Sequence, residues 1–326
     1  MMHRRHFLSQ SAAVSAALAV PAWLCGAATA QAQDVLRLVV GYPPGGSSDR
    51  VARILADKMG PLLGTSVIVD NKVGAGGRVA AQGLRNAPAS PPVLMLANPA
   101  VMVVSPLVVD DPGYDANKDF VPVSEVNNYV FGVAVSTAVP VQELSHLFAW
   151  LRANPKSANI GVPATGSLPH FFALMLGQQA KVTAEAVGYK GSGPLLTDLI
   201  GGQVPVAVDT LDVLLPQHEA GKLRILAVSG DARHPSVPKV PTLKESGLNL
   251  SAEGWNTVFA PRSMPPEQVA RYAEVIQKIM GDPETARLFR ASNLDPVVSS
   301  STQTRDRIAA YRKQWEPVIR ASGYRP

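Results

Sequence analysis

The sequence predicts an α/β protein organised as two domains. Short apolar runs alternate with helical patterns along the chain, which is typical of sheets built from β-α-β units. The chain has 326 residues, more than the roughly 100 to 200 residues of a usual domain. Several apolar runs end in glycine-rich or hydroxyl-rich turns, and ligands of open α/β sheets bind outside such strand ends. We therefore expect a ligand site where these turns meet.

The first residues, 1–32, have the features of an export signal that is cleaved from the mature protein. Arg4 and Arg5 precede an apolar stretch followed by small residues, as in twin-arginine leaders. This stretch is too short and interrupted for a permanent membrane helix. Its removal takes away Cys25, the sole cysteine, so we expect a periplasmic protein without disulfides or thiolate metal sites. Lipidation of Cys25 is the less favoured alternative, because Leu24 precedes it where a small residue is required.

The first strand-turn-helix unit is the strongest local pattern. An apolar run at Leu36–Val40 leads into the turn of Val39–Asp49, and Val51, Leu55 and Met59 then recur at helical spacing. The pattern predicts a buried strand, a tight turn and an amphipathic helix.

The glycines of this turn suit an anion site. Gly45 and Gly46 let backbone N–H groups approach a ligand, and Ser47 or Ser48 is expected to cap the helix. The helix N-terminus adds partial positive charge, which favours a carboxylate or phosphate. On turn chemistry alone, a capped turn without a ligand is equally favoured.

Nucleotide binding is disfavoured by the same residues. A Walker loop ends in Gly-Lys-Ser/Thr, whereas Asp49 and Arg50 stand at that place. A dinucleotide fingerprint spreads its glycines over six positions, whereas Gly45 and Gly46 are adjacent. We therefore favour a small organic anion.

Two further strand ends follow in the first half. Val67–Val69 predicts a second strand, and the glycine turn Asn71–Gly77 precedes a helix at Arg78–Arg85. A third strand at Val93–Ala97 ends at Asn98. Three turns thus offer polar or glycine-rich edges on one side of one sheet.

The second half begins after two apolar runs, Val121–Val126 and Val130–Val135, which we expect to carry the chain between domains. A helix at Pro140–Asn154 and a strand at Ala158–Val162 follow. The next turn, Pro163–His170, repeats the glycine and hydroxyl pattern of the first.

The last ligand candidates follow two further strands. Glu185–Tyr189 predicts a strand, Lys190–Pro194 a turn, Leu195–Ile200 a helix and Val204–Val208 another strand. Asp209 follows that strand directly. A helix cap and a ligand-facing role are equally open for it.

Catalytic and metal sites are disfavoured. The chain lacks a Gly-x-Ser-x-Gly elbow and a His-Glu-x-x-His pattern. Ser167 and His170 lie three residues apart, which favours a cap and a first-turn residue over a nucleophile with its base. His218 and Glu219 lack a second ligand at helical spacing. A hydrolase is therefore the third choice of function, and we expect no metal and no cofactor.

The ordered set of motifs resembles one family. The residues that carry the resemblance are Pro43–Asp49, Asn71–Gly77, Asp119–Val123, Thr165–Ser167, Tyr189–Ser192, Leu199–Val204, Gly221–Arg224 and Val240–Thr242. In this order they are similar to the extracytoplasmic solute receptors of tripartite tricarboxylate transporters, the Bug family. Three places depart from the family pattern, namely Ser90–Pro92, Gly188 and Val73. We expect these departures to affect the shape of the loops and the identity of the ligand more than the fold.

The resemblance implies a two-domain periplasmic binding protein of type II, a "Venus flytrap" with parallel-rich sheets flanked by helices and two crossover strands. It implies a first domain at 34–128, a second domain at 129–229, and a return crossover with the rest of the first domain at 230–326. The implied function is capture of a small carboxylate between the domains and its delivery to membrane transporter subunits, without catalysis. Signalling to a membrane histidine kinase is the alternative.

The expected ligand contacts lie at strand ends in both halves. They are Tyr42, Pro44, Gly45, Gly46, Ser47, Asp49, Gly76, Asn98, Thr165, Gly166, Ser167, His170, Tyr189, Lys190 and Asp209. Removal of Arg4 and Arg5 lowers the formal net charge from +5 to +3, and no Lys/Arg cluster is interleaved with aromatic residues. We therefore expect no binding to nucleic acid. We also expect the protein to be a monomer.

Overall fold

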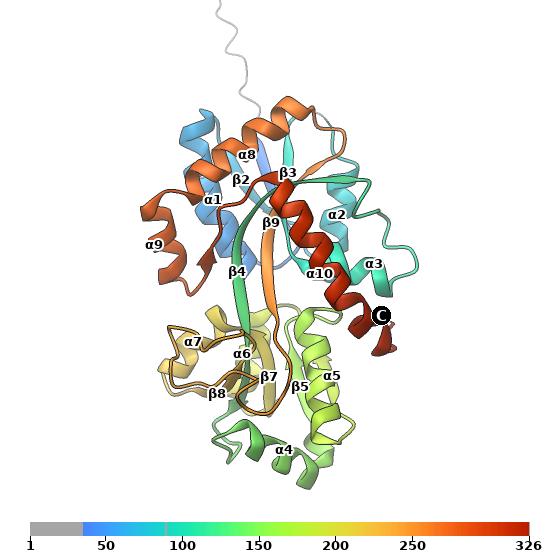
Figure 1. Ribbon diagram of the computed structural model, residues 1–326, viewed down its shortest axis with the longest axis vertical. Coiled ribbons are helices and arrows are strands. Elements are labelled where there is room, and N and C mark those ends of the chain that lie inside the picture. The colour runs from blue at the N-terminus through green and yellow to red at the C-terminus, as the bar shows by residue number, and fades with distance from the viewer. Residues whose placement is uncertain (1–34, 89, 326) are drawn as a thin grey trace, which may run out of the picture. The chain divides into compact units, whose positions relative to one another are not determined.

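Strands and helices alternate along the chain (Figure 1). The computed structural model describes residues 35–88 and 90–325, which belong to the compact unit Asp34–Pro326; the expected export signal, with Cys25, lies outside the described residues. The elements as far as the long central strand are β1 (Leu36–Val40), α1 (Ser47–Leu63), β2 (Val67–Asn71), a short 3₁₀ turn (Ala75–Gly77), α2 (Arg78–Arg85), β3 (Val93–Ala97), a π turn (Ala100–Val104), α3 (Ser105–Val108) and β4 (Phe120–Ser136).

The remaining elements begin with a helix beyond that strand. They are α4 (Leu144–Ala153), a 3₁₀ turn (Pro155–Ser157), β5 (Asn159–Val162), α5 (Leu168–Ala180), β6 (Glu185–Gly188), α6 (Ser192–Ile200), β7 (Val206–Thr210), α7 (Leu211–Glu219), β8 (Leu223–Val228), β9 (Glu253–Pro261), α8 (Pro266–Met280), α9 (Pro283–Ala291), β10 (Asp295–Pro296) and α10 (Ser301–Ala321).

The strand order explains why distant turns meet. The strands follow the order β2-β1-β3-β9-β4-β7-β5-β6, while β8 and β10 also pair with β4. Strand β1 is parallel to β2 and β3, and β5 is parallel to β6 and β7. Between these two sets, the pairs β3–β9, β9–β4 and β4–β7 are all antiparallel, so β7 runs opposite to β3. The carboxyl ends of the two parallel sets therefore face each other.

The long strand β4 connects the two sets. Its first part, as far as Val130, pairs with β9, and its second part, from Phe131, pairs with β7. Figure 1 shows β4 and β9 side by side, running between the upper and lower groups of helices. The sequence predicted two apolar runs at this place, whereas the structure has one strand. The interruption is Asn127, whose buried amide oxygen accepts a hydrogen bond from Asn256 on β9.

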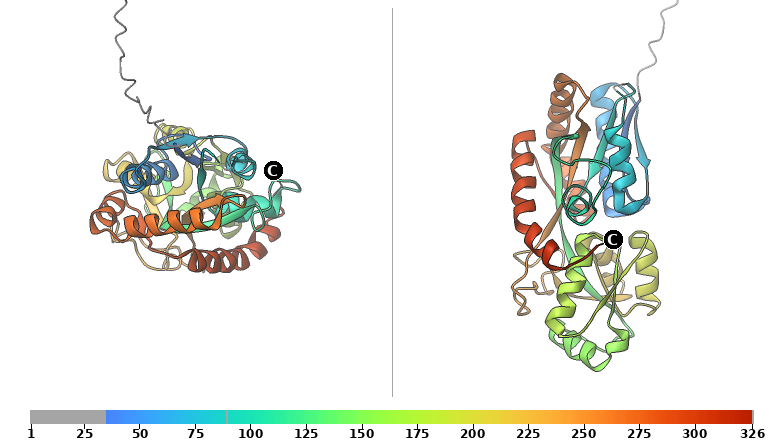
Figure 2. Two further views of the ribbon diagram at one scale, coloured as in Figure 1. Left: turned by 90° about the horizontal axis from the view of Figure 1, so that it is seen from above. Right: turned by 90° about the vertical axis from the view of Figure 1, so that its right-hand side faces the viewer.

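Helices cover the sheet on both faces. Helices α8 and α10 contact β4, and α1 contacts β2 and α8. The side view in Figure 2 shows α10 and α1 on opposite sides of the central strands. Helix α1 forms because Val51, Leu55 and Met59 recur on one face and are fully buried, each contributing on the order of 1.5 to 3 kcal/mol. The chain therefore has the mixed α/β architecture with helix-covered sheets that the sequence predicts.

Three elements have the bounds that the sequence predicts, and most of the others differ by one to four residues at an end. Strands β1 and β3 and helix α2 have the predicted bounds, whereas α4 begins at Leu144 rather than Pro140. Trp255 and Phe259 on β9 are buried and pack in the core. No helix among the described residues combines the length and apolar character needed to cross a bilayer. Residues 35–88 and 90–325 also contain no group of three or more side chains able to hold a metal ion.

Candidate functional site

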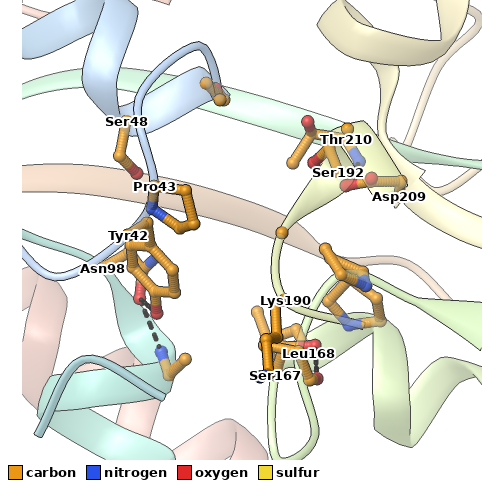
Figure 3. A pocket seen from close by; sticks show the side chains of 18 of the residues that line it. Tyr42, Pro43, Ser48, Asn98, Ser167, Leu168, Lys190, Ser192, Asp209 and Thr210 are labelled. Carbon is orange, nitrogen blue, oxygen red and sulfur yellow. Dashed lines mark hydrogen bonds between the residues drawn. The ribbon is translucent and has the colours of Figure 1, made fainter. Parts of the chain in front are cut away.

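A cavity of about 270 Å³ lies where the facing strand ends meet (Figure 3). Its wall includes the turns after β1, β3, β5 and β6 and the last residues of β7. Tyr129 and Phe131 of β4 also line it, close to the point where β4 leaves one set of strands and joins the other. The lining combines apolar side chains with a few polar groups, as is usual for a site that encloses a small organic ligand.

Helix N-termini converge on this cavity. The residues that precede α1, α5, α6 and α7 are Gly46, Ser167, Gly191 and Thr210, and all of them line the cavity. None of these residues makes a side-chain hydrogen bond that caps its helix. Pro169 and Pro194 have no N–H, and the N–H of His170 donates to Ser167 O over 3.0 Å. The remaining first-turn N–H groups and the positive ends of the helix dipoles are available to an anion.

The β1 side of the cavity is held by hydrogen bonds. Tyr42 donates to Asn98 Oδ1 over 3.1 Å, and burial raises the pKa of Tyr42 to about 12, so that it stays protonated. Gly45 N donates to Asp49 Oδ2 over 2.9 Å, and Gly45 has a φ of 85°, which a side chain would strain. Burial alone would raise the pKa of Asp49. Hydrogen bonds from Arg53, Gly45 and Asn71 more than offset the effect of burial, so the pKa of Asp49 is lowered. Asp49 therefore shapes the glycine turn.

The β5 side contains a second turn of related design. Ser167 Oγ donates to Ala164 O over 2.7 Å, and Gly166 N donates to His170 Nδ1 over 2.9 Å. Burial lowers the pKa of His170, which favours the neutral ring that can accept this hydrogen bond. The ring of His170 also packs edge-on against Tyr324, with centroids 4.3 Å apart. His170 therefore supports the turn from behind.

Two buried carboxyl groups lie at the β7 side. Asp212, on the first turn of α7, pairs with Arg50 of α1. Asp209, within β7, lines the cavity beside Ser192 (Figure 3) and has no ion pair among the described residues. Burial raises the pKa of both carboxyl groups, that of Asp209 to about 7.

A larger cavity of about 640 Å³ adjoins the first. The two share Tyr42, Pro43, Pro163, Ala164, Lys190 and Gly191 in their linings. The cleft is narrow at this boundary: a Cβ atom added to Gly191 would lie 3.3 Å from Pro43 Cγ. Arg78 and Tyr324 line the second cavity only. The second cavity thus forms a wider approach to the first.

The structure brings most of the predicted contact residues to these two cavities. Nine line the first cavity, namely Tyr42, Pro44, Gly45, Gly46, Ser47, Asn98, Ser167, Lys190 and Asp209. Gly76, Thr165, Gly166 and Tyr189 line the second cavity. Asp49 and His170 line neither cavity and instead support the turns.

Two local interpretations are wrong. Helix α1 begins after Gly46, so neither serine caps it, and Ser48 Oγ donates instead to Asn256 Oδ1 over 3.0 Å. Asp209 does not follow the strand but lies within it, and Thr210 precedes α7. The helix-cap alternative for Asp209 is therefore excluded.

Several cavity residues were not predicted as ligand contacts. Ser192 and Thr210 are polar lining residues at helix starts, and turn composition after β6 could have indicated Ser192. Tyr129 and Phe131 lie two positions apart on β4, and their spacing places them on one face of a strand. No local pattern indicated that this face would meet the cavity.

A cavity of this size, enclosed by helix N-termini at facing strand ends, is the site of a solute-binding protein rather than a polymer-binding surface. The family described as "Tripartite tricarboxylate transporter family receptor" matches residues 51–324. The chain belongs to this family of periplasmic solute-binding receptors, as the motif order predicted.

Individual relatives agree with this assignment. A UPF0065 protein of Bordetella bronchiseptica is 31% identical over 329 residues, covering 99% of this chain and 98% of its own. Protein BugT of Bordetella pertussis is 29% identical, covering 88% of this chain and 89% of its own. The solved structure "R. palustris Rpa4515 with adipate" has a TM-score of 0.85 and 30% identity, and the match covers 90% of this chain and 98% of that one.

Proposed function

We propose that the protein captures a small carboxylate in the first cavity and delivers it to membrane subunits of a tripartite tricarboxylate-type transporter. The observation that carries this proposal is the convergence of four helix N-termini, all without side-chain caps, on a cavity of about 270 Å³. Such N–H groups stabilise a carboxylate without a counter-cation. The similarity to a receptor solved with adipate supports the ligand class.

A thermal-shift screen over mono-, di- and tricarboxylates tests the proposal. A ligand at a hundredfold excess over its Kd adds about 2.7 kcal/mol to the free energy of unfolding, which corresponds to a rise in Tm of roughly 5 °C or more. The expected result is such a rise with at least one carboxylate and none with its uncharged amide. A complete absence of carboxylate-dependent shifts would contradict the proposed ligand class.

The transport role requires export of the chain. We propose twin-arginine-dependent export with a mature N-terminus near Gln31 or Gln33, on the basis of Arg4 and Arg5. The double variant Arg4→Lys/Arg5→Lys should leave precursor in the cytoplasm. An unchanged periplasmic yield would argue against this route. Dependence of carboxylate uptake on the receptor gene would favour transport, whereas a ligand-induced kinase response would favour the signalling alternative.

Ligand capture is proposed to close the cleft between a domain formed by 34–128 with 230–326 and a domain formed by 129–229. Both sides contribute N-termini to the cavity, and Pro43 and Gly191 already approach each other across it. Small-angle scattering should show a smaller radius of gyration at saturating ligand. An unchanged scattering profile at full occupancy would reject closure while leaving the ligand site intact.

A further inference from the structure

Asp209 carries the only carboxyl group among the described residues that line the first cavity. Its side chain is 1% exposed and lines the cavity. Asp209 Oδ1 accepts from the N–H of Thr210 over 2.7 Å, whereas Oδ2 is buried without a hydrogen bond of ordinary geometry, although the Ser192 hydroxyl lies nearby. Its cross-strand neighbour on β4 is Gly132, which has no side chain to pack over the carboxyl. Oδ2 is thus a buried carboxylate oxygen without a partner of ordinary geometry, on a side chain that lines the cavity.

The nearest guanidinium is already engaged. Arg50 donates to Asp212 and, over 3.2 Å, to Gly45 O. The hydroxyls of Ser47 and Thr210 also lie near Asp212. Arg50 therefore hydrogen-bonds Asp212 and acts on Asp209 only through space, as the weakest of the effects on its pKa.

The charged and titratable groups around Asp209 come from four directions. They are Arg50 on α1, Asp212 on α7, Tyr129 on β4 and Lys190 before α6, the last of which is exposed. With Arg50 bound to Asp212, an ionised Asp209 leaves this corner one negative charge in excess. Burying such a charge without a partner is costly, and burial accordingly raises the pKa of Asp209 to about 7.

Buried polar atoms in native proteins nearly always find a partner. An ionised carboxylate oxygen can only accept, so the missing partner of Asp209 Oδ2 is a hydrogen-bond donor whenever Asp209 is ionised, as it is above its pKa of about 7. An alkyl dicarboxylate offers only acceptors when ionised, and it adds negative charge to the same cavity. An ammonium or hydroxyl substituent offers the donor, and an ammonium also supplies the missing positive charge.

We propose that Asp209 is the specificity-determining residue of this receptor and accepts a hydrogen bond from an ammonium or hydroxyl group of the ligand. The substrate class is then an amino- or hydroxy-substituted carboxylate, with its carboxylate at the uncapped helix N-termini and its donor group at β7. This inference rests on the proposed function and refines its ligand class. It predicts an order of affinities within sets of ligands that share one carbon skeleton.

Isothermal titration calorimetry with matched ligands gives the test. One set is glutarate, 2-hydroxyglutarate and glutamate, and a second is adipate and its 2-hydroxy and 2-amino derivatives. At pH 8, where Asp209 is ionised, the substituted acids should bind about tenfold or more tightly than their parent diacid, as expected for one charge-assisted hydrogen bond. Between pH 6 and pH 8, affinity for the amino acids should rise and affinity for the parent diacids should fall.

The Asp209→Asn variant should reduce the preference to about threefold or less without weakening the parent diacids. The matched control is Glu125→Gln, because Glu125 is also 1% exposed, also has an unpartnered carboxyl oxygen and lies outside the cavity. This control should keep the wild-type order of affinities. If Asp209→Asn fails to fold, the opposite pH trends of wild-type protein for amino acids and parent diacids provide the same test.

Three results would overturn the inference. They are parent diacids that bind as tightly as their substituted forms, an unchanged preference in folded Asp209→Asn, or the same loss of preference in both variants. If the parent diacids bind tightly and as well as their substituted forms, this inference fails but the proposed carboxylate-binding function is retained. If no carboxylate of any set binds, the proposed function itself fails and this inference fails with it.

Discussion

The first turns of the helices that begin at the cavity differ from those of α9 and α10, the two helices whose first turns are capped by a side chain among the described residues. Helix α10 begins with a capping box in which the Ser300 hydroxyl accepts from Gln303 N and the Gln303 side chain accepts from Ser300 N. Asp282 similarly accepts from Thr285 N at the start of α9. At the cavity, no helix-preceding residue caps with its side chain, including a serine and a threonine that have the right chemistry.

The difference between capped and uncapped helix N-termini distinguishes residues that stabilise the fold from residues that can bind a ligand. A side-chain cap stabilises a helix by about 1 kcal/mol because it satisfies one first-turn N–H group. The cavity helices lack that gain, as α2, α4 and α8 also do. What distinguishes the cavity helices is that their unbonded first-turn N–H groups lie at the cavity, where water or a ligand can accept from them. A change at an uncapped N-terminus should therefore alter affinity, whereas a change at a capped one should alter the free energy of unfolding.

The largest expected effect is that of Gly46→Val at the start of α1. The backbone there, with φ −78° and ψ 174°, permits any residue, and an added Cβ would have only Pro43 O nearby, 3.8 Å away. The side chain would instead occupy the space where a carboxylate approaches the N–H groups. We expect affinity to fall at least about a hundredfold with little change in Tm, measured by calorimetry and thermal unfolding. Retained affinity in the folded variant would remove α1 from the anion site.

The sequence predicted those parts of the site that depend on local pattern. Strand β1, the glycine turn and α1 follow from an apolar run, adjacent glycines and helical spacing within one segment. The Arg50–Asp212 pair joins residues 162 positions apart, and no local signal relates them. Asp209 was expected after its strand because charge normally ends a buried run, whereas in the structure it lies within β7.

The role of β4 likewise depends on tertiary structure. Asparagine is uncommon in the middle of a buried strand, so the sequence predicted that the apolar run ends before Asn127. In the structure, Asn256 on β9 and Ser48 on α1 form a hydrogen-bonded chain with Asn127 that makes the polar side chain compatible with burial. These partners are too distant in sequence to be predicted.

A second prediction concerns pH and the far side of β4. Glu125 contacts Arg307 on α10 at 3.2 Å, yet burial raises its pKa to about 7 from 4.5. Because the folded-state pKa is the higher one, the stabilising contribution of this group is complete below about pH 4.5 and is lost as the pH rises through 7. The ligand-free protein should therefore lose on the order of 1 to 3 kcal/mol between pH 5 and pH 8 in urea unfolding.

Asp209 titrates in the same direction, so the variants separate the two regions. Glu125→Gln and Asp209→Asn should each flatten part of the pH dependence, and the double variant should flatten most of it. Only the Asp209 variant should also change the ligand preference. A pH dependence that neither variant alters would locate its cause elsewhere.

A smaller effect is expected from Ser300→Ala at the capped N-terminus of α10. The change removes one half of the capping box, so the free energy of unfolding should fall by about 1 kcal/mol. Affinity should remain within about twofold of wild type, because Ser300 lines neither cavity. A comparable loss of affinity would show that α10 is coupled to the cavity.

The smallest effect is expected from Ser167→Ala, which can be compared directly with Ser300→Ala because both serines immediately precede a helix. Ser167 precedes α5 as Ser300 precedes α10, but its hydroxyl donates to Ala164 O over 2.7 Å and does not cap the helix. Loss of one hydrogen-bonding hydroxyl at the cavity should cost about 0.5 to 1.5 kcal/mol of binding free energy, roughly twofold to tenfold in Kd. Calorimetry and urea unfolding on both alanine variants decide the matter. If Ser167→Ala lowers stability as Ser300→Ala does and leaves Kd unchanged, then α5 is an ordinary structural helix and its N-terminus takes no part in holding the ligand.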